Sequence, residues 1–578
     1  MNTPIQTSVR RVRKHLLAKF SRSFASALTL IAVALVCFGL SPTAYGVRPT
    51  PSPSSTPSPT ATPVPTPLGE DRGSNNSAAE SVDALNINTT GLSNTAHGWH
   101  ALSANTAGND NTANGFKTLF NNTTGSYNTA DGVEALENNT EGIHNTAIGW
   151  QALLSNTTGN ANTANGAIAL TGNTTGTFNT AMGGGALSSN TTGSANTAMG
   201  GFALTSNLTG DANTAIGINA LYGNTIGVQN TATGAGALFQ NTTGNYNTAD
   251  GVEALDNNTE GTHNTATGWQ SLLRNTTGNA NTANGATALS GNTAGVFNTA
   301  MGGGALSSNT TGNSNTATGG FALTSNVTGD ANTATGLNAL YNNTIGVQNT
   351  ADGGAALSEN TTGNYNTAVG VQALEYNTTG SGNIALGFTA GSGVTTANNV
   401  ISIGIAGQDV SNSCYIGRIF GATSSGGTAV FVNADGRLGT ATSSKRFKED
   451  IKAMNNASEI LFALKPVTFR YKKEIDPQGV PQFGLIAEEV AEVNPQLVVR
   501  DKEGKVNTVR YEQINAMLLN EFLKEHKRVE EQQVTISDLK KDLGVLTAQL
   551  KEQAAEIRKV SAQLEMRRPL TRVARSYP

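Results

Sequence analysis

Cysteine, proline and basic residues are scarce in this chain, and each scarcity excludes something. Only two of the 578 residues are cysteines, which excludes a disulfide framework and any metal site built on cysteine. No proline occurs between Pro67 and Pro466, as stacked β-strands require. Residues 77–399 contain 16 Asp or Glu but only two Lys or Arg, so the net charge of −4 hides an acidic centre. A basic, nucleic-acid-binding body is therefore not supported.

The centre of the chain is a 17-residue unit that repeats over residues 77–399 without insertion or deletion. The unit reads Asn-Thr-Ala-x-Gly-x-x-Ala-Leu-x-x-Asn-Thr-Thr-Gly-x-x, and we number its positions 1 to 17. Asn-Thr-Ala opens each copy from Asn94 to Asn366, and residues 128–150 recur nearly unchanged at 247–269, seven units later. A fixed period without slippage is typical of a solenoid, in which each unit forms one stacked rung.

The composition of the unit predicts its secondary structure. Asn, Thr and Gly are poor helix formers, and the unit is long enough for two or three short strands joined by tight turns. We therefore predict a mainly β fold, a parallel β-solenoid with a Leu column inside and Asn and Thr ladders along its length. Some nineteen rungs at about 4.8 Å each give a rod on the order of 90 Å. One Leu and two Ala per rung make a thin core, which favours association of several chains along their length.

The Ala and Gly pattern of the rungs resembles the β-roll heads of trimeric autotransporter adhesins, whose rungs are shorter. This resemblance covers the repeats alone and implies a homotrimer. Trp99, Trp150 and Trp269 share position 6, directly after the invariant Gly. We expect them to pack on the surface or between chains, with a ligand platform as the alternative.

The N-terminus is typical of an export segment. Six Lys or Arg between residues 10 and 22 precede an apolar run over residues 24–40, which predicts a signal peptide over residues 1–46, with an uncleaved membrane anchor as the alternative. Residues 47–76 are a Pro/Ser/Thr-rich linker that cannot pack a core. Either interpretation places the bulk of the chain at the cell surface or outside the cell.

The period is lost after residue 399. Residues 400–442 alternate apolar residues with Gly and turn residues, which predicts a β-rich neck. Composition changes at Ser443, and four blocks follow in order: Ser443-Ser-Lys-Arg-Phe-Lys448, Leu464–Tyr471, Phe483–Val490 and Val509–Tyr511. Together they resemble the intramolecular chaperone auto-processing domain of peptidase S74. The resemblance implies a small α+β domain over residues 443–525 that trimerises and aligns a fibre.

The same resemblance implies a catalytic pair. In that family a serine and a lysine five positions later cut the chain beside the serine, which assigns Ser443 as nucleophile, Lys448 as general base and Arg446 as the motif's arginine. A serine hydroxyl needs a nearby base, and a lysine can serve when burial or neighbouring cations lower its pKa. The family usually has Asp where this chain has Ser444, so Ser444 is an alternative nucleophile, and a trimerisation domain without cleavage is an alternative to self-cleavage.

The C-terminal region carries a seven-residue apolar repeat, which predicts a coiled coil over residues 526–566 followed by a basic tail over residues 567–578. Three strands are implied by the family resemblance rather than by the pattern. The repeat consists of Phe522, Val529, Ile536, Leu543, Leu550, Ile557 and Leu564, with Leu518, Leu539, Leu546 and Val560 at the companion positions.

Taken together, the sequence predicts an exported, homotrimeric fibrous surface protein, either an adhesin or a display shaft, with a self-cleaving C-terminal chaperone. Its cleavage would be a single-turnover event, with no activity on external substrates. We expect no cofactor, metal or nucleic-acid partner; the partners are further copies of the chain and, as a further candidate, a host or surface receptor. Membrane contact is expected only through residues 24–40, and only where that segment is left uncleaved. The alternatives are a relative of phage-type tail fibres and an ice- or surface-binding solenoid.

Overall fold

The computed structural model describes residues 70, 71, 77–81 and 83–567, so the predicted signal peptide and most of the linker and basic tail lie outside it. The described chain forms two compact units, the first ending at Gly417 and the second beginning at Arg418. Among the helices of these described residues, none combines the length and hydrophobicity that a membrane crossing needs.

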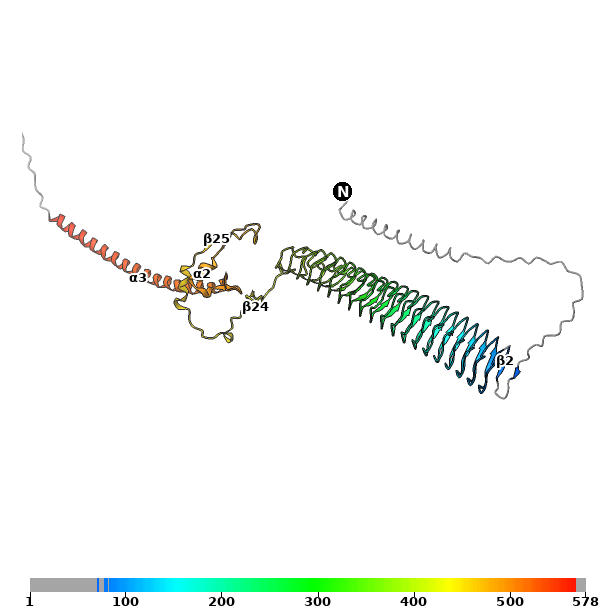
Figure 1. Cartoon of the computed structure of the whole chain (residues 1–578). Coiled ribbons are helices and arrows are strands. Elements are labelled where there is room, and N and C mark those ends of the chain that lie inside the picture. Colours follow the sequence, from blue (N-terminus) through cyan, green and yellow to red (C-terminus); the bar gives the residue numbers. More distant parts are fainter. Residues whose placement is uncertain (1–69, 72–76, 82, 568–578) are drawn as a thin grey trace, which may run out of the picture. The chain divides into compact units, whose positions relative to one another are not determined.

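The first unit is the predicted solenoid, which we call the shaft, and Figure 1 shows its stacked rungs. Its strands pair in parallel and in register, each with the equivalent residues one rung away, so the fold prediction is confirmed. Each rung contains a single three-residue strand, however, and the expected two or three strands per rung were wrong. A short strand β1 (Glu70–Asp71) pairs antiparallel with β2 (Ala78–Glu80).

The strands of the regular rungs occupy positions 2 to 4 of the repeat. They are β3 (Thr95–His97), β4 (Thr112–Asn114), β5 (Thr129–Asp131), β6 (Thr146–Ile148), β7 (Thr163–Asn165), β8 (Thr180–Met182), β9 (Thr197–Met199), β10 (Thr214–Ile216), β11 (Thr231–Thr233), β12 (Thr248–Asp250), β13 (Thr265–Thr267), β14 (Thr282–Asn284), β15 (Thr299–Met301), β16 (Thr316–Thr318), β17 (Thr333–Thr335), β18 (Thr350–Asp352), β19 (Thr367–Val369) and β20 (Ile384–Leu386).

The remainder of each rung turns through left-handed backbone. Position 5 has φ of +133° at Gly217, where a Cβ atom would lie only 2.6 Å from the carbonyl oxygen of Gly234 in the next rung. Position 9 is also left-handed, with φ of +52° at Leu238. That conformation costs a non-glycine residue about 1–2 kcal/mol. Because the Leu238 side chain is fully buried, hydrophobic transfer of about 1.5–3 kcal/mol offsets the cost.

Two ladders of buried asparagines run along the inside of the shaft. At position 1, Asn230 donates from both its backbone N and its Nδ2 to Asn213 Oδ1, at 3.0 and 3.2 Å. At position 12, Asn241 Nδ2 donates to Asn224 Oδ1 at 2.8 Å. Both ladders also donate to the carbonyl of the Gly at position 15, as Asn230 and Asn241 do to Gly244. The buried asparagines therefore find their hydrogen-bond partners, and the buried leucines their packing, within one chain. Burial of the core does not require neighbouring chains.

The shaft continues into the region expected as a neck. β21 (Ile401–Ile403) and β22 (Cys414–Ile416) extend the parallel sheet, and the pairing of Ile401 with Cys414 makes the last rung shorter by four residues. In most regular rungs, the amides of positions 13 and 14 donate to one carbonyl of the following rung, and in several rungs the amide of position 15 does so too, as those of residues 140–142 do to Thr157. The shortened rung lacks the equivalent carbonyl arrangement.

The carboxylate of Asp409 takes the place of that carbonyl. Asp409 Oδ1 accepts the backbone N–H groups of Thr395, Thr396 and Ala397 at 2.7–2.8 Å, and Oδ2 accepts both threonine hydroxyls. Burial opposes ionisation of this carboxyl, but the hydrogen bonds from Thr395, Thr396 and Ala397 outweigh it and hold the pKa of Asp409 well below its usual range. Asp409 therefore caps the C-terminal end of the regular stack.

The second unit has a small mixed core. Its elements are the hairpin of β23 (Val430–Val432) and β24 (Leu438–Thr440), the 3-10 helices η1 (Lys445–Phe447), η2 (Asn455–Ala463) and η3 (Pro495–Leu497), the hairpin of β25 (Val467–Phe469) and β26 (Gln482–Gly484), helix α2 (Ala487–Val493), the hairpin of β27 (Val498–Arg500) and β28 (Val506–Val509), and helix α3 (Tyr511–Met566). The buried apolar residues are Val490, Leu497, Val498, Val509, Ile514 and Met517.

Helix α3 carries the predicted heptad repeat on one continuous helix. Its 56 residues span about 84 Å. The seven main heptad residues, from Phe522 to Leu564, are between 44% and 67% exposed in the single chain. Such a long apolar stripe is not stable alone in water, which favours pairing with further copies of α3. The helix begins at Tyr511, ahead of the coiled-coil boundary expected at residue 526.

A polar cluster fixes η2 against the start of α3. The buried hydroxyl of Ser458 donates to Glu521 Oε1 at 2.5 Å and accepts from Asn520 Nδ2 at 2.6 Å. Lys524 Nζ donates to the same Glu521 oxygen at 2.7 Å. The hydrogen bonds from Lys524 and Ser458 lower the pKa of Glu521. Because η2 and α3 are far apart in sequence, this cluster ties the two ends of the domain together.

Candidate functional site

The residues predicted to form a catalytic pair are in contact. Lys448 Nζ donates a hydrogen bond to Ser443 Oγ at 3.0 Å. The short helix η1 lies between them and is closed by two backbone bonds, from Phe447 N to the Ser444 carbonyl and from Lys448 N to the Lys445 carbonyl. This single tight turn brings the side chains at its two ends to the same side.

The other two predicted residues lie nearby but outside this contact. Ser444 is the N-cap residue of η1, yet its side chain makes no capping hydrogen bond, and the Lys448 amine bonds Ser443 rather than Ser444. Arg446 lies over the ring of Phe447, with its guanidinium carbon 4.6 Å from the ring centroid. The geometry therefore favours Ser443 over Ser444 as the partner of Lys448, and it places Arg446 on an aromatic ring.

The arrangement supplies a hydroxyl next to a potential base, the minimum that serine nucleophilic chemistry requires. Ser443 and Lys448 are both exposed in the single chain. An amine can accept a proton only when it is neutral, and burial favours the neutral form. The pair is therefore assembled in geometry, while the desolvation that would activate it is not provided by this chain alone.

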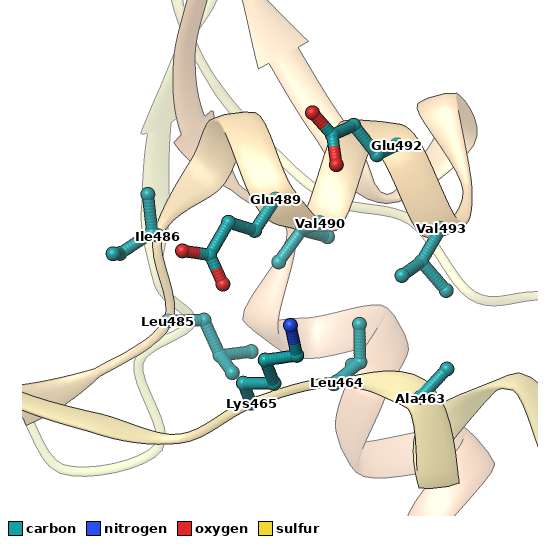
Figure 2. Close-up of a pocket in the computed structure, with 9 residues that line it drawn as sticks. All are labelled: Ala463, Leu464, Lys465, Leu485, Ile486, Glu489, Val490, Glu492 and Val493. Carbon is teal, nitrogen blue, oxygen red and sulfur yellow. The ribbon is translucent and has the colours of Figure 1, made fainter.

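A second candidate is a small pocket between α2 and the segment that follows η2. Figure 2 shows Lys465 and Glu489 projecting into it from opposite walls, with the apolar side chains of Leu464, Leu485 and Val490 around them. The cavity measures about 80 Å³, which is room for a few water molecules. Sequence reasoning did not single out Lys465 or Glu489, although both lie inside blocks that carry the family resemblance.

The comparisons with known proteins bear on this second unit. Residues 443–499 match the family model described as Chaperone of endosialidase, in peptidase S74. These residues form a chaperone-of-endosialidase domain. The match begins at Ser443 and includes Lys448, η2, the β25–β26 hairpin and α2, so the resemblance predicted from the sequence blocks is confirmed. Chaperone domains of this type are associated with trimeric fibres, which is consistent with self-association of this chain.

No curated protein and no solved structure matches the chain. Within residues 70, 71, 77–81 and 83–567, no three His, Cys, Asp or Glu side chains gather in a group that could hold a metal ion. A chaperone domain that follows a β-solenoid shaft fits a fibrous protein of the tail-fibre kind.

Proposed function

We propose that this chain is an exported, homotrimeric fibrous surface protein whose chaperone domain aligns three shafts and then cuts the chain at Ser443. The observation that carries the proposal is the 3.0 Å hydrogen bond from Lys448 Nζ to Ser443 Oγ, located where the chaperone domain begins. The exposed heptad stripe of α3 supports the trimer, because three parallel helices would bury it.

In the proposed reaction, the Ser443 oxygen attacks the carbonyl carbon of Thr442 while the Lys448 amine takes the hydroxyl proton. The resulting ammonium returns that proton to the departing amide nitrogen of Ser443, which leaves an ester between Thr442 and the Ser443 oxygen. Water then hydrolyses the ester, so Thr442 ends as a carboxylate and Ser443 as a free N-terminus. Attack on the preceding carbonyl closes a five-membered ring, whereas attack by Ser443 on its own carbonyl would close a strained four-membered ring.

Assembly supplies the missing activation in this proposal. A partner copy that covers Lys448 would favour its neutral amine, so cleavage would follow trimer formation. The order is useful, because removing the chaperone after alignment makes the assembled shafts kinetically hard to take apart.

The test is to produce the full chain alongside the variants Ser443→Ala, Lys448→Ala and Ser444→Ala, and to follow fragments on denaturing gels. We expect the wild type to yield a C-terminal fragment whose first residue is Ser443, as N-terminal sequencing would read it. Both Ser443→Ala and Lys448→Ala should abolish the fragment, and Ser444→Ala should retain it. Loss of the fragment in Ser444→Ala alone would move the nucleophile by one residue.

A variant of α3 separates assembly from chemistry. Ile536→Asp places a charge in the heptad stripe, far along the chain from the Ser443–Lys448 pair. We expect it to remain monomeric by light scattering and to remain uncut. Efficient cleavage of a monomeric Ile536→Asp chain would refute the proposed dependence on assembly. If the wild type forms a trimer but yields no fragment, the proposed cleavage is refuted and the domain serves only in trimerisation.

Export and adhesion are parts of the proposal that rest on the sequence. The basic flank and apolar run before residue 41 support export, and the linker over residues 47–76 would hold the shaft away from the surface. Cell fractionation with antibodies against the shaft tests export, and binding of cells to immobilised shaft tests adhesion. The ice-binding alternative is less favoured, since the outward threonines at position 2 are accompanied on the same strands by charged or bulky residues such as Asp131 and Met182.

A further inference from the structure

Position 6 of the repeat forms an uninterrupted apolar column along the outside of the shaft. Every residue directly after the position-5 Gly is apolar or Gly, and each is exposed or half-buried. The column consists of Trp99, Phe116, Val133, Trp150, Ala167, Gly184, Gly201, Ile218, Ala235, Val252, Trp269, Ala286, Gly303, Gly320, Leu337, Gly354, Val371, Phe388 and Ile405.

The other outward positions are interrupted by charges, with the exception of positions 2 and 13, which are threonine in most rungs. Two rungs illustrate this clearly, because positions 4, 7, 10 and 14 are all acidic in both. These residues are Asp131, Glu134, Glu137 and Glu141 in one rung and Asp250, Glu253, Asp256 and Glu260 seven rungs later. Two shafts that lay against each other along such columns would bring like charges together.

We propose that the position-6 column is the strip along which the shafts of different copies of this chain lie against one another, and that its pattern of bulky and small residues sets their register. This inference rests on the proposed function, since it assumes that the chains self-associate. Association of α3 would hold the attached shafts at a high effective concentration. A strip about 90 Å long and about 10 Å wide amounts to ~900 Å² on each partner, the size of a standard stable interface.

The register between neighbouring shafts must be encoded on their outer surface, because the core residues make no contact with another chain. The Leu column and both asparagine ladders are closed within each chain, so sliding a neighbour leaves them unchanged. Identical chains arranged in a closed ring must lie at the same level along the shaft. If each chain were shifted along the axis relative to the last, the shifts would add up around the ring and the last chain would not meet the first. At that level Trp150 of each copy meets Trp150 of the next.

A displaced chain would lose this match at most slips. A slip of one rung sets Trp150 beside Ala167, whereas a slip of seven rungs sets it beside Trp269. The small residues Gly184 and Gly201 recur likewise as Gly303 and Gly320. The competing register is therefore a slip of seven rungs rather than one, and this is the error that an aligning chaperone has to prevent.

Disulfide cross-linking of the full chain tests the face. In a background without Cys37 and Cys414, we would compare Gly201→Cys with Thr209→Cys, an exposed residue at position 14 of the same rung. A Cβ atom at Gly201 meets nothing within 4 Å, so this substitution is tolerated by the fold. Mild oxidation should link copies through Gly201→Cys and not through Thr209→Cys.

The outcomes separate this inference from the proposed function. Cross-links that are equal at the two sites, or stronger with Thr209→Cys, would refute the face. An intact oligomer by light scattering with no link through Gly201→Cys would refute it too, and would leave the column open to a partner other than a copy of this chain. A monomeric protein would overturn both the face and the proposed trimer.

Mixed refolding tests the register. Chains with Gly201→Cys would be denatured and refolded with an equal amount of chains carrying either Gly320→Cys, seven rungs further on, or Ala286→Cys, five rungs further on. Aligned shafts keep both pairs too far apart to link, so a mixed disulfide reports a slip. We expect links between equal positions to dominate, and the mixed disulfides that do form to be several-fold more frequent with Gly320→Cys than with Ala286→Cys. Equal mixed yields, or more with Ala286→Cys, would show that the column does not encode a seven-rung period.

Discussion

Replacing one asparagine of the position-1 ladder should remove the only partner of a backbone amide in the next rung. Asn213 Oδ1 accepts from both the N and the Nδ2 of Asn230, while Asn213 Nδ2 donates to Asn196 Oδ1 and to the Gly227 carbonyl. In Asn213→Ala, the Gly227 carbonyl keeps its bond from Asn224 Nδ2. The backbone N–H of Asn230 loses its acceptor and stays buried.

The magnitude follows from that difference. A buried amide without a partner costs about 1–3 kcal/mol, and the space left by the missing amide group raises the total loss of unfolding free energy to about 2–4 kcal/mol. The chain offers its own control at Ser77, whose hydroxyl accepts the backbone N–H of Asn94 at 3.2 Å. Asn213→Ser should therefore restore part of the loss, because a serine oxygen can occupy the same acceptor position.

Hydrogen exchange combined with urea unfolding would measure this effect. We expect the Asn230 amide to lose protection in Asn213→Ala and to regain part of it in Asn213→Ser, with the unfolding midpoints following in the same order. Asn224→Ala in the position-12 ladder should cost less, since it removes one bond each from the side-chain oxygen of Asn207 and the side-chain nitrogen of Asn241 but leaves no backbone amide unpaired. Unchanged protection of Asn230 in Asn213→Ala, or equal damage from Asn213→Ser, would refute the reasoning.

Three further predictions concern the shaft. Ser402 is buried with its hydroxyl unpaired at the position that holds Ala385 one rung earlier, so Ser402→Ala should raise the unfolding free energy by about 1–3 kcal/mol and Ala385→Ser should lower it, as urea titration would measure. Asp409→Ala should lose amide protection at the end of the shaft, as hydrogen exchange would measure. Because the folded pKa of Asp409 lies below the ordinary aspartate pKa of 3.8, the wild-type carboxylate should stabilise that end above this pH and lose its effect as the pH falls through the folded pKa. Gly217→Ala should cost about 3 kcal/mol or more in thermal unfolding because of its φ and its close carbonyl contact, whereas Gly201→Ala should be nearly neutral.

Much of the shaft could be predicted from the sequence, because its period fixes which residues stack. The Leu column and the asparagine ladders are where the repeat placed them, for example Leu238 and Asn213, both fully buried. The single strand per rung could not be foreseen, because it depends on leucines such as Leu238 adopting left-handed backbone, against their intrinsic preference. Burial overrides that preference, and burial is a property of the stack rather than of the unit.

The second unit shows a similar division. The spacing of Ser443 and Lys448 came with a family motif, and the tight turn of η1 places them in contact. The cap formed by Asp409 could not be predicted, because it depends on a shortened rung that brings one carboxylate onto three amides of the preceding turn. Periodic sequence predicts the regular part of the structure, and the places where the period changes depend on contacts that the pattern does not contain.

The position-12 ladder has a consequence for how the shaft can be made. Its Asn-Thr-Thr triplets match the acceptor pattern for N-linked glycosylation. A sugar on Asn241, which opens one of these triplets, would replace a hydrogen on Nδ2, which already donates to both Asn224 and Gly244 inside the shaft. No space exists there for a glycan, since the residue is fully buried. A secretory pathway that glycosylates nascent chains would therefore prevent the rungs from stacking, and production in such a host should yield unfolded shaft.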